Sequence, residues 1–174
     1  MIIELGDIRI GGGNPFVLIA GPCVVENEEM IMHTASAIKE ITGRHAIPFI
    51  FKSSYRKANR TSTKSFTGIG DVEALNVLRR AKQKLDIPIL TDTHTPDEAW
   101  QAAAVADILQ IPAFLSRQTE LLEAAGSTGK IINIKKGQFL APEDMKYAAE
   151  KVSSSGNKKI MLTERGASFG YREW

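Results

Sequence analysis

The stretch that decides the fold spans residues 47–92 and reads IPFIFKSSYRKANRTSTKSFTGIGDVEALNVLRRAKQKLDIPILTD. It opens with an apolar strand, Ile47–Lys52, and closes with a second one, Ile87–Asp92. Between them, Val72–Leu85 has the apolar spacing of an amphipathic helix. Strands that are apolar throughout and joined by a helix predict parallel pairing, because the crossover helix must cover a face of the sheet.

The same alternation continues on both sides of this stretch. Upstream, a hairpin over Ile2–Ile10 is predicted to lead into a buried strand at Phe16–Ala20, and a helix follows Glu26 and stops near Gly43. Downstream, the predicted elements are a helix at Pro96–Ala104 behind Thr95 as N-cap, a strand at Ile108–Ile111, a helix at Arg117–Ala125, a strand at Ile131–Lys135, a helix at Pro142–Val152 and a strand at Lys159–Thr163.

About six βα units result, which favours a (β/α)8 TIM barrel of the α/β class with an N-terminal hairpin. We expect residues 1–174 to form a single, incomplete barrel domain, since eight units take roughly 250 residues. An open doubly wound sheet is the alternative, but the Gly-rich GxGxxG turn is missing after its first strand.

Composition and charge exclude several classes of protein. The chain has 174 residues, of which 43% are hydrophobic and 24% charged, as in ordinary globular domains. Basic and acidic residues are interspersed and the net charge is +2, so no nucleic-acid partner is indicated. The sequence has neither a signal-peptide pattern nor a membrane-spanning apolar run, and we expect a cytoplasmic protein without a membrane partner. Its single cysteine permits no intramolecular disulfide.

Polar side chains stand where the predicted strands end, which is where barrel chemistry gathers. Lys52, Lys135 and Arg165 would repel one another at a shared centre unless a polyanion is bound there. The segment 52–64 adds further cations with no acid among them. Two sites for phosphate or carboxylate groups are therefore predicted. The full set of strand-end residues is Cys23, Lys52, Asp92, His94, Gln110, Lys135, Glu164 and Arg165.

Cys23, in GPCVVE, has three interpretations from sequence: a buried small hydrophobe, a thiolate metal ligand, or a catalytic nucleophile. Its place at the mouth of a strand favours the metal ligand. Among the histidines, His33 and His45 are interpreted as structural or surface residues, and His94 as the candidate for the site.

Six motifs together resemble one enzyme family, that of 3-deoxy-D-manno-octulosonate 8-phosphate synthase, over nearly the whole chain. The most specific part is KANRTS at 57–62, because the related 3-deoxy-D-arabino-heptulosonate 7-phosphate synthases differ there. The motifs are GPCVVE at 21–26, FKSSYRKANRTS at 51–62, TDTH at 91–94, QIPAFLSRQT at 110–119, NIKKGQFLAP at 133–142 and LTERGASFGY at 162–171.

The resemblance implies condensation of phosphoenolpyruvate with arabinose 5-phosphate and water, for lipopolysaccharide sugar biosynthesis, by a homotetramer. It implies that Lys135 and Arg165, with the backbone at Ala113, hold the phosphoenolpyruvate phosphate. By the same resemblance, Lys52 lies near the carboxylate, Lys57 and Asn59 contact the reacting ends, Arg60 and Thr61 hold the sugar phosphate, Asp92 orients the sugar, and Gln110 binds substrate. Many family members have serine where this chain has Thr61, which keeps the hydroxyl donor.

The resemblance also implies that Cys23 is a ligand of a divalent metal such as zinc, iron or manganese, as in the metal-dependent branch of the family. The family's other three ligands, a histidine, a glutamate and an aspartate, follow later strands and have no counterpart before Trp174. We expect a fragment of a longer protein, a degenerate product without activity, or a barrel completed by another chain. The alternative functions are a non-catalytic phosphate-binding remnant and the heptulosonate 7-phosphate synthase.

Overall fold

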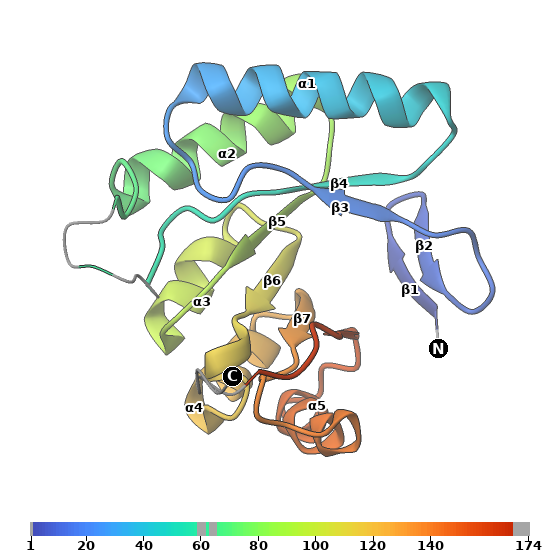
Figure 1. The fold of residues 1–174 in the computed structure, drawn as a ribbon, viewed down its shortest axis with the longest axis vertical. Coiled ribbons are helices and arrows are strands. Elements are labelled where there is room, and N and C mark those ends of the chain that lie inside the picture. The colour runs from blue at the N-terminus through green and yellow to red at the C-terminus, as the bar shows by residue number, and fades with distance from the viewer. Residues whose placement is uncertain (1, 59–61, 63–65, 169–174) are drawn as a thin grey trace, which may run out of the picture. The chain divides into compact units, whose positions relative to one another are not determined.

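The structure is a computed structural model that describes residues 2–58, 62 and 66–168 (Figure 1). The predicted catalytic residue Asn59 and the predicted substrate-binding residues Arg60 and Thr61 lie outside the described residues. The chain divides into two compact units. Unit 1 comprises Met1–Asp92 and Ala104–Asp107, and unit 2 comprises Thr93–Ala103 and Ile108–Trp174. The single barrel domain stays a prediction.

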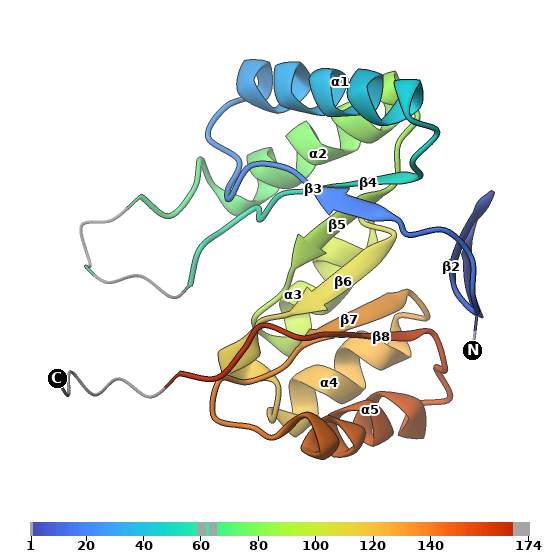
Figure 2. The same ribbon diagram turned by 45° about the vertical axis from the view of Figure 1, so that its right-hand side comes forward.

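Unit 1 begins with an antiparallel hairpin of β1 (Ile2–Leu5) and β2 (Ile8–Gly11). Three parallel strands follow in chain order, β3 (Leu18–Ala20), β4 (Phe49–Lys52) and β5 (Ile89–Asp92). Figures 1 and 2 show the two long helices of this unit on the same side of β3 and β4. They are α1 (Glu28–Arg44) and α2 (Asp71–Leu85), and the core between sheet and helices includes Ile31, Phe51, Leu75 and Leu78.

Unit 2 contains the parallel strands β6 (Ile108–Ile111), β7 (Ile131–Lys135) and β8 (Ile160–Thr163). Its helices pack against one another, α4 contacting both α3 and α5. They are α3 (Pro96–Ala103), α4 (Thr119–Ser127) and α5 (Met145–Ser154), with short 3-10 turns η1 (Ala113–Leu115) and η2 (Pro142–Asp144). Leu122, Ala125, Ile132 and Val152 are fully buried in its core.

The predicted α/β class and the N-terminal hairpin are confirmed. In both units neighbouring parallel strands are also successive in the chain, as they are in a barrel. The structure thus agrees with a partial TIM barrel. In the described part of the chain, none of the helices combines the length and the apolar character that crossing a bilayer requires.

Three predicted strands begin two residues later than expected: the one predicted at Phe16–Ala20 starts at Leu18, and proline explains the difference for the other two. The strands predicted at Ile47 and Ile87 start at Phe49 and Ile89. Pro48 and Pro88 have no N–H to donate, but their carbonyl oxygens accept bonds from Leu18 and Phe51, both 2.9 Å long. Each Ile-Pro pair also follows a residue in the left-handed conformation, Ala46 or Asp86, which turns the chain out of its helix.

Two predicted helices have different limits. The helix expected at Arg117–Ala125 starts at Thr119, because η1 and a turn that bonds the Gln118 N–H to the Leu115 carbonyl occupy the preceding residues. The helix expected from Pro142 starts as the 3-10 turn η2 and becomes an α-helix at Met145.

The prediction of Thr95 as N-cap of α3 is confirmed, since its Oγ1 accepts a 3.3 Å bond from the Glu98 N–H.

Gly21, directly after β3, allows the ends of β3 and β4 to lie close together. A Cβ atom at Gly21 would overlap the backbone carbonyl oxygen of Lys52. We expect Gly21→Ala to lower the free energy of unfolding by roughly 1–3 kcal/mol, because the strand ends would have to separate. Urea denaturation checks this, with Gly43→Ala in α1 as the control. A Cβ at Gly43 meets no atom within 4 Å, so equal destabilisation by both changes would contradict the steric account.

Candidate active site

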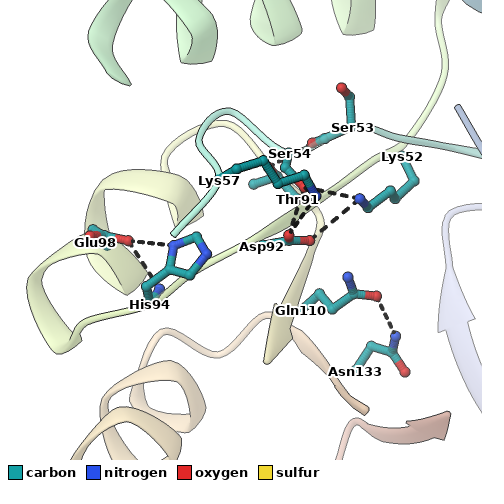
Figure 3. A network of polar contacts seen from close by, with 10 residues as sticks. All are labelled: Lys52, Ser53, Ser54, Lys57, Thr91, Asp92, His94, Glu98, Gln110 and Asn133. Carbon is teal, nitrogen blue, oxygen red and sulfur yellow. Dashed lines mark hydrogen bonds and ion pairs between the residues drawn. The ribbon is translucent and has the colours of Figure 1, made fainter. Parts of the chain in front are cut away.

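Four side chains from the ends of β4 and β5 form a polar cluster in unit 1 (Figure 3). We call Lys52, Ser54, Lys57 and Asp92 the lysine–aspartate cluster. Ser54 lies at its centre, where its Oγ accepts from Lys52 Nζ at 3.0 Å and from Lys57 Nζ at 2.7 Å. The same hydroxyl donates to Asp92 Oδ2 at 2.6 Å. Both ammonium groups also lie 3.6 Å from a carboxylate oxygen of Asp92.

The sheet register brings these side chains together. Lys52 pairs with Leu90, and Asp92 stands two residues after Leu90 on the same face of the sheet. The chain stays extended beyond β4, since the Val25 N–H bonds the Ser54 carbonyl at 2.9 Å. The Thr91 hydroxyl fixes the adjacent backbone by donating to the Ser53 carbonyl at 2.8 Å. Lys57 is held by its own N–H, which donates to the Thr67 carbonyl at 3.0 Å.

The cluster is suited to binding an anion. Its two ammonium groups and one carboxylate leave a net positive charge. The side chains of Lys52 and Lys57 are 20% and 21% exposed, and that of Asp92 is 9% exposed. Partial burial strengthens electrostatic attraction relative to water. Asp92 offsets the mutual repulsion of the two lysines, and it can accept hydrogen bonds from a ligand hydroxyl.

Cys23 is exposed, so its interpretation as a buried small hydrophobe is wrong. Its backbone carbonyl accepts a 3.4 Å bond from the Ser54 N–H, and the next residue, Val24, forms a parallel β-bridge with Ser54. The backbone of Cys23 therefore lies beside the backbone of a residue in the lysine–aspartate cluster. Over residues 2–58, 62 and 66–168, no group of three or more His, Cys, Asp or Glu side chains could hold a metal ion. A single thiolate does not make a catalytic metal site, which takes about three protein ligands. The described residues therefore do not fit the metal on their own.

Unit 2 has two buried amide side chains on neighbouring strands, Gln110 and Asn133, which we call the buried amide row (Figure 3). Asn133 on β7 donates from Nδ2 to Gln110 Oε1 on β6 at 3.1 Å and accepts at Oδ1 from the Thr163 hydroxyl on β8 at 2.8 Å. Gln110 is 8% exposed and Asn133 is 3% exposed. Lys135 follows Asn133 by two residues, so it leaves β7 on the same face. These bonds fix the face from which Lys135 extends.

His94 forms a second polar pair within unit 2. Its ring Nδ1 and its backbone N–H both lie 3.0 Å from Glu98 Oε2 in the first turn of α3 (Figure 3). Glu98 is 7% exposed, so the carboxylate orients the imidazole within a partly desolvated surrounding. His33 and His45 are exposed, in agreement with their interpretation as surface residues.

The loops after β7 and β8 carry the remaining predicted residues. Lys135 is half-buried and Arg165 is exposed. Glu164 Oε1 accepts from the N–H groups of Gly166 at 2.6 Å and Arg165 at 2.8 Å, which shapes the turn around Arg165. The bond from Gly166 is the main reason that the pKa of the Glu164 carboxyl lies below its usual value, with Arg165 N–H and Lys136 contributing. Ala113 is buried at the start of η1.

Sequence reasoning missed three residues that organise these surroundings, namely Ser54, Asn133 and Lys136. Ser54 and Asn133 stand two residues from a predicted ligand on the same strand face, so strand alternation could have found them. Lys136 gave no signal, because its partners are backbone carbonyls of loop residues. Lys52 belongs to unit 1, whereas Gln110, Lys135 and Arg165 belong to unit 2.

The fold and these strand-end residues define a parallel α/β protein with cationic side chains at and beyond its strand ends. The chain belongs to the DAHP synthetase I family, whose model matches residues 1–174. It is 54% identical over 169 residues to proteins named 2-dehydro-3-deoxyphosphooctonate aldolase from Desulfosudis oleivorans and from Geobacter sp. strain M21. These alignments cover 97% of this chain but 61% and 62% of the two relatives, so the chain spans about three fifths of their length.

A relative from Koribacter versatilis carries the same name and is 54% identical over 168 residues, covering 60% of its length. The resemblance to the octulosonate 8-phosphate enzymes that the motifs indicated is thus confirmed. The names of these relatives do not favour the heptulosonate 7-phosphate alternative.

Proposed function

We propose that the protein containing this chain condenses phosphoenolpyruvate with D-arabinose 5-phosphate and water, giving 3-deoxy-D-manno-octulosonate 8-phosphate and inorganic phosphate. The observation that carries the proposal is the lysine–aspartate cluster, together with 54% identity to relatives named for the octulosonate product. Lipopolysaccharide sugar biosynthesis in the cytoplasm by a homotetramer is the corresponding proposal for its setting.

The reaction joins two anions that repel each other in water. C3 of phosphoenolpyruvate forms the new bond to the aldehyde carbon of the sugar, whose oxygen gains a proton and becomes a hydroxyl. Water adds at C2, and the C2 carbon then loses inorganic phosphate to leave the ketone. The protein's contribution is to hold both substrates with the reacting carbons close together and to stabilise the charge that develops at C2.

Each candidate residue has a proposed role in that arrangement. Lys135 and Arg165 hold the phosphate of phosphoenolpyruvate, with the backbone at Ala113, and Lys52 pairs with its carboxylate. Lys57 contacts the reacting ends, where its bond to Ser54 fixes the ammonium. Asp92 accepts from sugar hydroxyls, and Gln110 supports the bound substrate. The proposal also assigns Asn59 to the reacting ends, and Arg60 and Thr61 to the sugar phosphate.

The test is phosphate release from phosphoenolpyruvate by the 174-residue chain, with arabinose 5-phosphate, with erythrose 4-phosphate, or with neither. We expect release that requires arabinose 5-phosphate. Equal or better use of erythrose 4-phosphate would overturn the choice of aldehyde. Folded chain that binds phosphoenolpyruvate without turnover would support instead a non-catalytic phosphate-binding role for this segment.

Cys23 as a metal ligand stays a prediction, and it requires ligands beyond the described residues. We expect Cys23→Asn to lower the zinc, iron or manganese content per chain, because the thiolate is lost, without changing the thermal unfolding curve. Elemental analysis after gel filtration measures this, with His45→Asn at an exposed histidine as control. An unchanged metal content in the Cys23 variant would reject the assignment.

A further inference from the structure

We propose that Lys136 is a positioning residue that fastens together the two loops carrying Lys135 and Arg165. The inference rests on the proposed function, because those two cations are the ones assigned to the phosphate of phosphoenolpyruvate. Lys136 itself would touch no substrate. Its role would be to set the distance and orientation of the groups that do.

The side chain of Lys136 is buried and fully engaged with the backbone. The residue is 4% exposed, which is rare for a lysine. Its Nζ donates to the carbonyl oxygens of Gly137 at 3.2 Å, Leu140 at 3.1 Å and Gly166 at 2.9 Å. An ammonium group has three N–H donors, so these three bonds use its whole capacity. Lys136 is therefore unsuited to bind a ligand phosphate directly.

The three acceptors belong to two different loops. Gly137 and Leu140 follow β7, whereas Gly166 follows β8. Glu164, also after β8, lies 3.5 Å from the same ammonium through Oε1. One buried cation thus joins the loop that begins at Lys135 to the loop that contains Arg165. Charge-assisted bonds are stronger than neutral ones, so this junction resists separation.

Backbone bonds extend the junction on both sides of the ammonium. The Lys136 N–H donates to the Thr163 carbonyl at 2.9 Å, and the Ser168 N–H donates to the Gln138 carbonyl at 3.4 Å. Arg165 stands between Glu164 and Gly166, and both of these contact Lys136. The backbone of Arg165 is therefore held on both sides, although its own side chain is exposed.

The third proposed phosphate contact lies beside the same loop. A Cβ atom at Gly137 would come within 3.2 Å of the Ala113 carbonyl oxygen, so the loop passes close to the start of η1. Because Lys136 anchors Gly137 and Gly166, its bonds link the surroundings of Lys135, Arg165 and Ala113. An anion site works best when its donors are fixed before the ligand arrives.

The experiment compares Lys136→Met, Lys135→Met and the control Lys158→Met in the 174-residue chain. Lys158 is exposed, and methionine keeps most of each apolar stem while removing the ammonium. Two quantities are measured, the affinity for phosphoenolpyruvate by calorimetry and the hydrogen exchange of the Gly166 and Ser168 amides by NMR. We expect Lys136→Met to weaken phosphoenolpyruvate binding roughly tenfold or more, because the phosphate contacts are misplaced. The same change should accelerate hydrogen exchange at both amides. Lys135→Met should weaken binding while both amides exchange at the wild-type rate.

The outcomes separate this inference from the proposed function. If the wild-type chain binds no phosphoenolpyruvate, the proposed function fails, and the amide rates alone decide whether Lys136 joins the loops. Wild-type exchange rates and affinity in Lys136→Met would overturn the inference while leaving the proposed function intact. If the methionine variant does not fold, Lys136→Gln keeps two of the donors and should give smaller changes in the same direction; no change in either quantity would overturn the inference.

Discussion

Asp92→Asn is expected to lower the free energy of unfolding by roughly 1–3 kcal/mol, because two partly buried ammonium groups would lose the carboxylate between them. The amide keeps the shape of the side chain but carries no charge. Lys52 and Lys57 would then repel each other across the Ser54 hydroxyl. Their exposure of about a fifth allows water to screen part of that repulsion, which keeps the expected loss below that of a fully buried pair.

Urea denaturation near neutral pH measures the effect, and Glu123→Gln provides the matched control. Glu123 lies on the exposed face of α4, so its change from carboxylate to amide should stay within about 0.5 kcal/mol. A double-mutant cycle with Lys57→Met then isolates the interaction across the 3.6 Å ion pair. Additive effects of the two changes would show that Asp92 does not stabilise Lys57.

The second large effect is expected at Asn133. Asn133→Leu should lower the free energy of unfolding by about 3 kcal/mol, because the donor to Gln110 and the acceptor for Thr163 disappear from a buried position. Leucine has the same branched outline as asparagine, but its two methyl groups make the side chain larger. The substitution should therefore disturb the ends of β6 and β8 as well as β7.

Thr163→Val tests how that loss is distributed, because it removes only the hydroxyl that donates to Asn133. We expect it to cost about 1 kcal/mol, the usual net value of one hydrogen bond. Gln83→Leu on the exposed side of α2 serves as the control for adding a leucine. If Asn133→Leu proved as mild as the change at Gln83, the buried amide row would contribute nothing to stability.

Sequence periodicity predicted the elements well and their limits less well. Apolar runs such as Ile108–Ile111 and Ile131–Lys135 match β6 and β7 residue for residue, since strands buried on both faces leave an uninterrupted pattern. The strands predicted from Ile47 and Ile87 were too long. Each apolar run includes a proline, whose carbonyl oxygen still accepts a bond from the neighbouring strand although the proline itself precedes the strand, and the apolar pattern does not reveal this limit. The predicted start of α4 was also wrong, because the residues of the turn before it are compatible with a helix and the sequence pattern does not separate the two.

The candidate site was predicted in part, and the limits have a physical cause. Lys52 and Asp92 could be chosen because strand-end polar residues are unusual, and Lys57 was chosen from the family resemblance. The structure places the ammonium group of each lysine 3.6 Å from a carboxylate oxygen of Asp92. The role of Lys136 could not be predicted, because any residue can supply a carbonyl oxygen. The sequence KK at 135–136 therefore conceals two lysines with opposite surroundings, one half-buried at the strand end and one held by three carbonyls.

The chain-order pairing of parallel strands also bears on how the protein is made. Within each unit, each parallel strand after the first pairs with the strand one βα step earlier, as in Leu18 with Phe49 or Ile108 with Ile131. Contacts that are close in sequence form quickly, since little loop entropy is lost in closing them. Synthesis on the ribosome proceeds from the N-terminus, so each emerging strand finds its neighbour already exposed. The cluster around Ser54 would then assemble as soon as β5 leaves the exit tunnel.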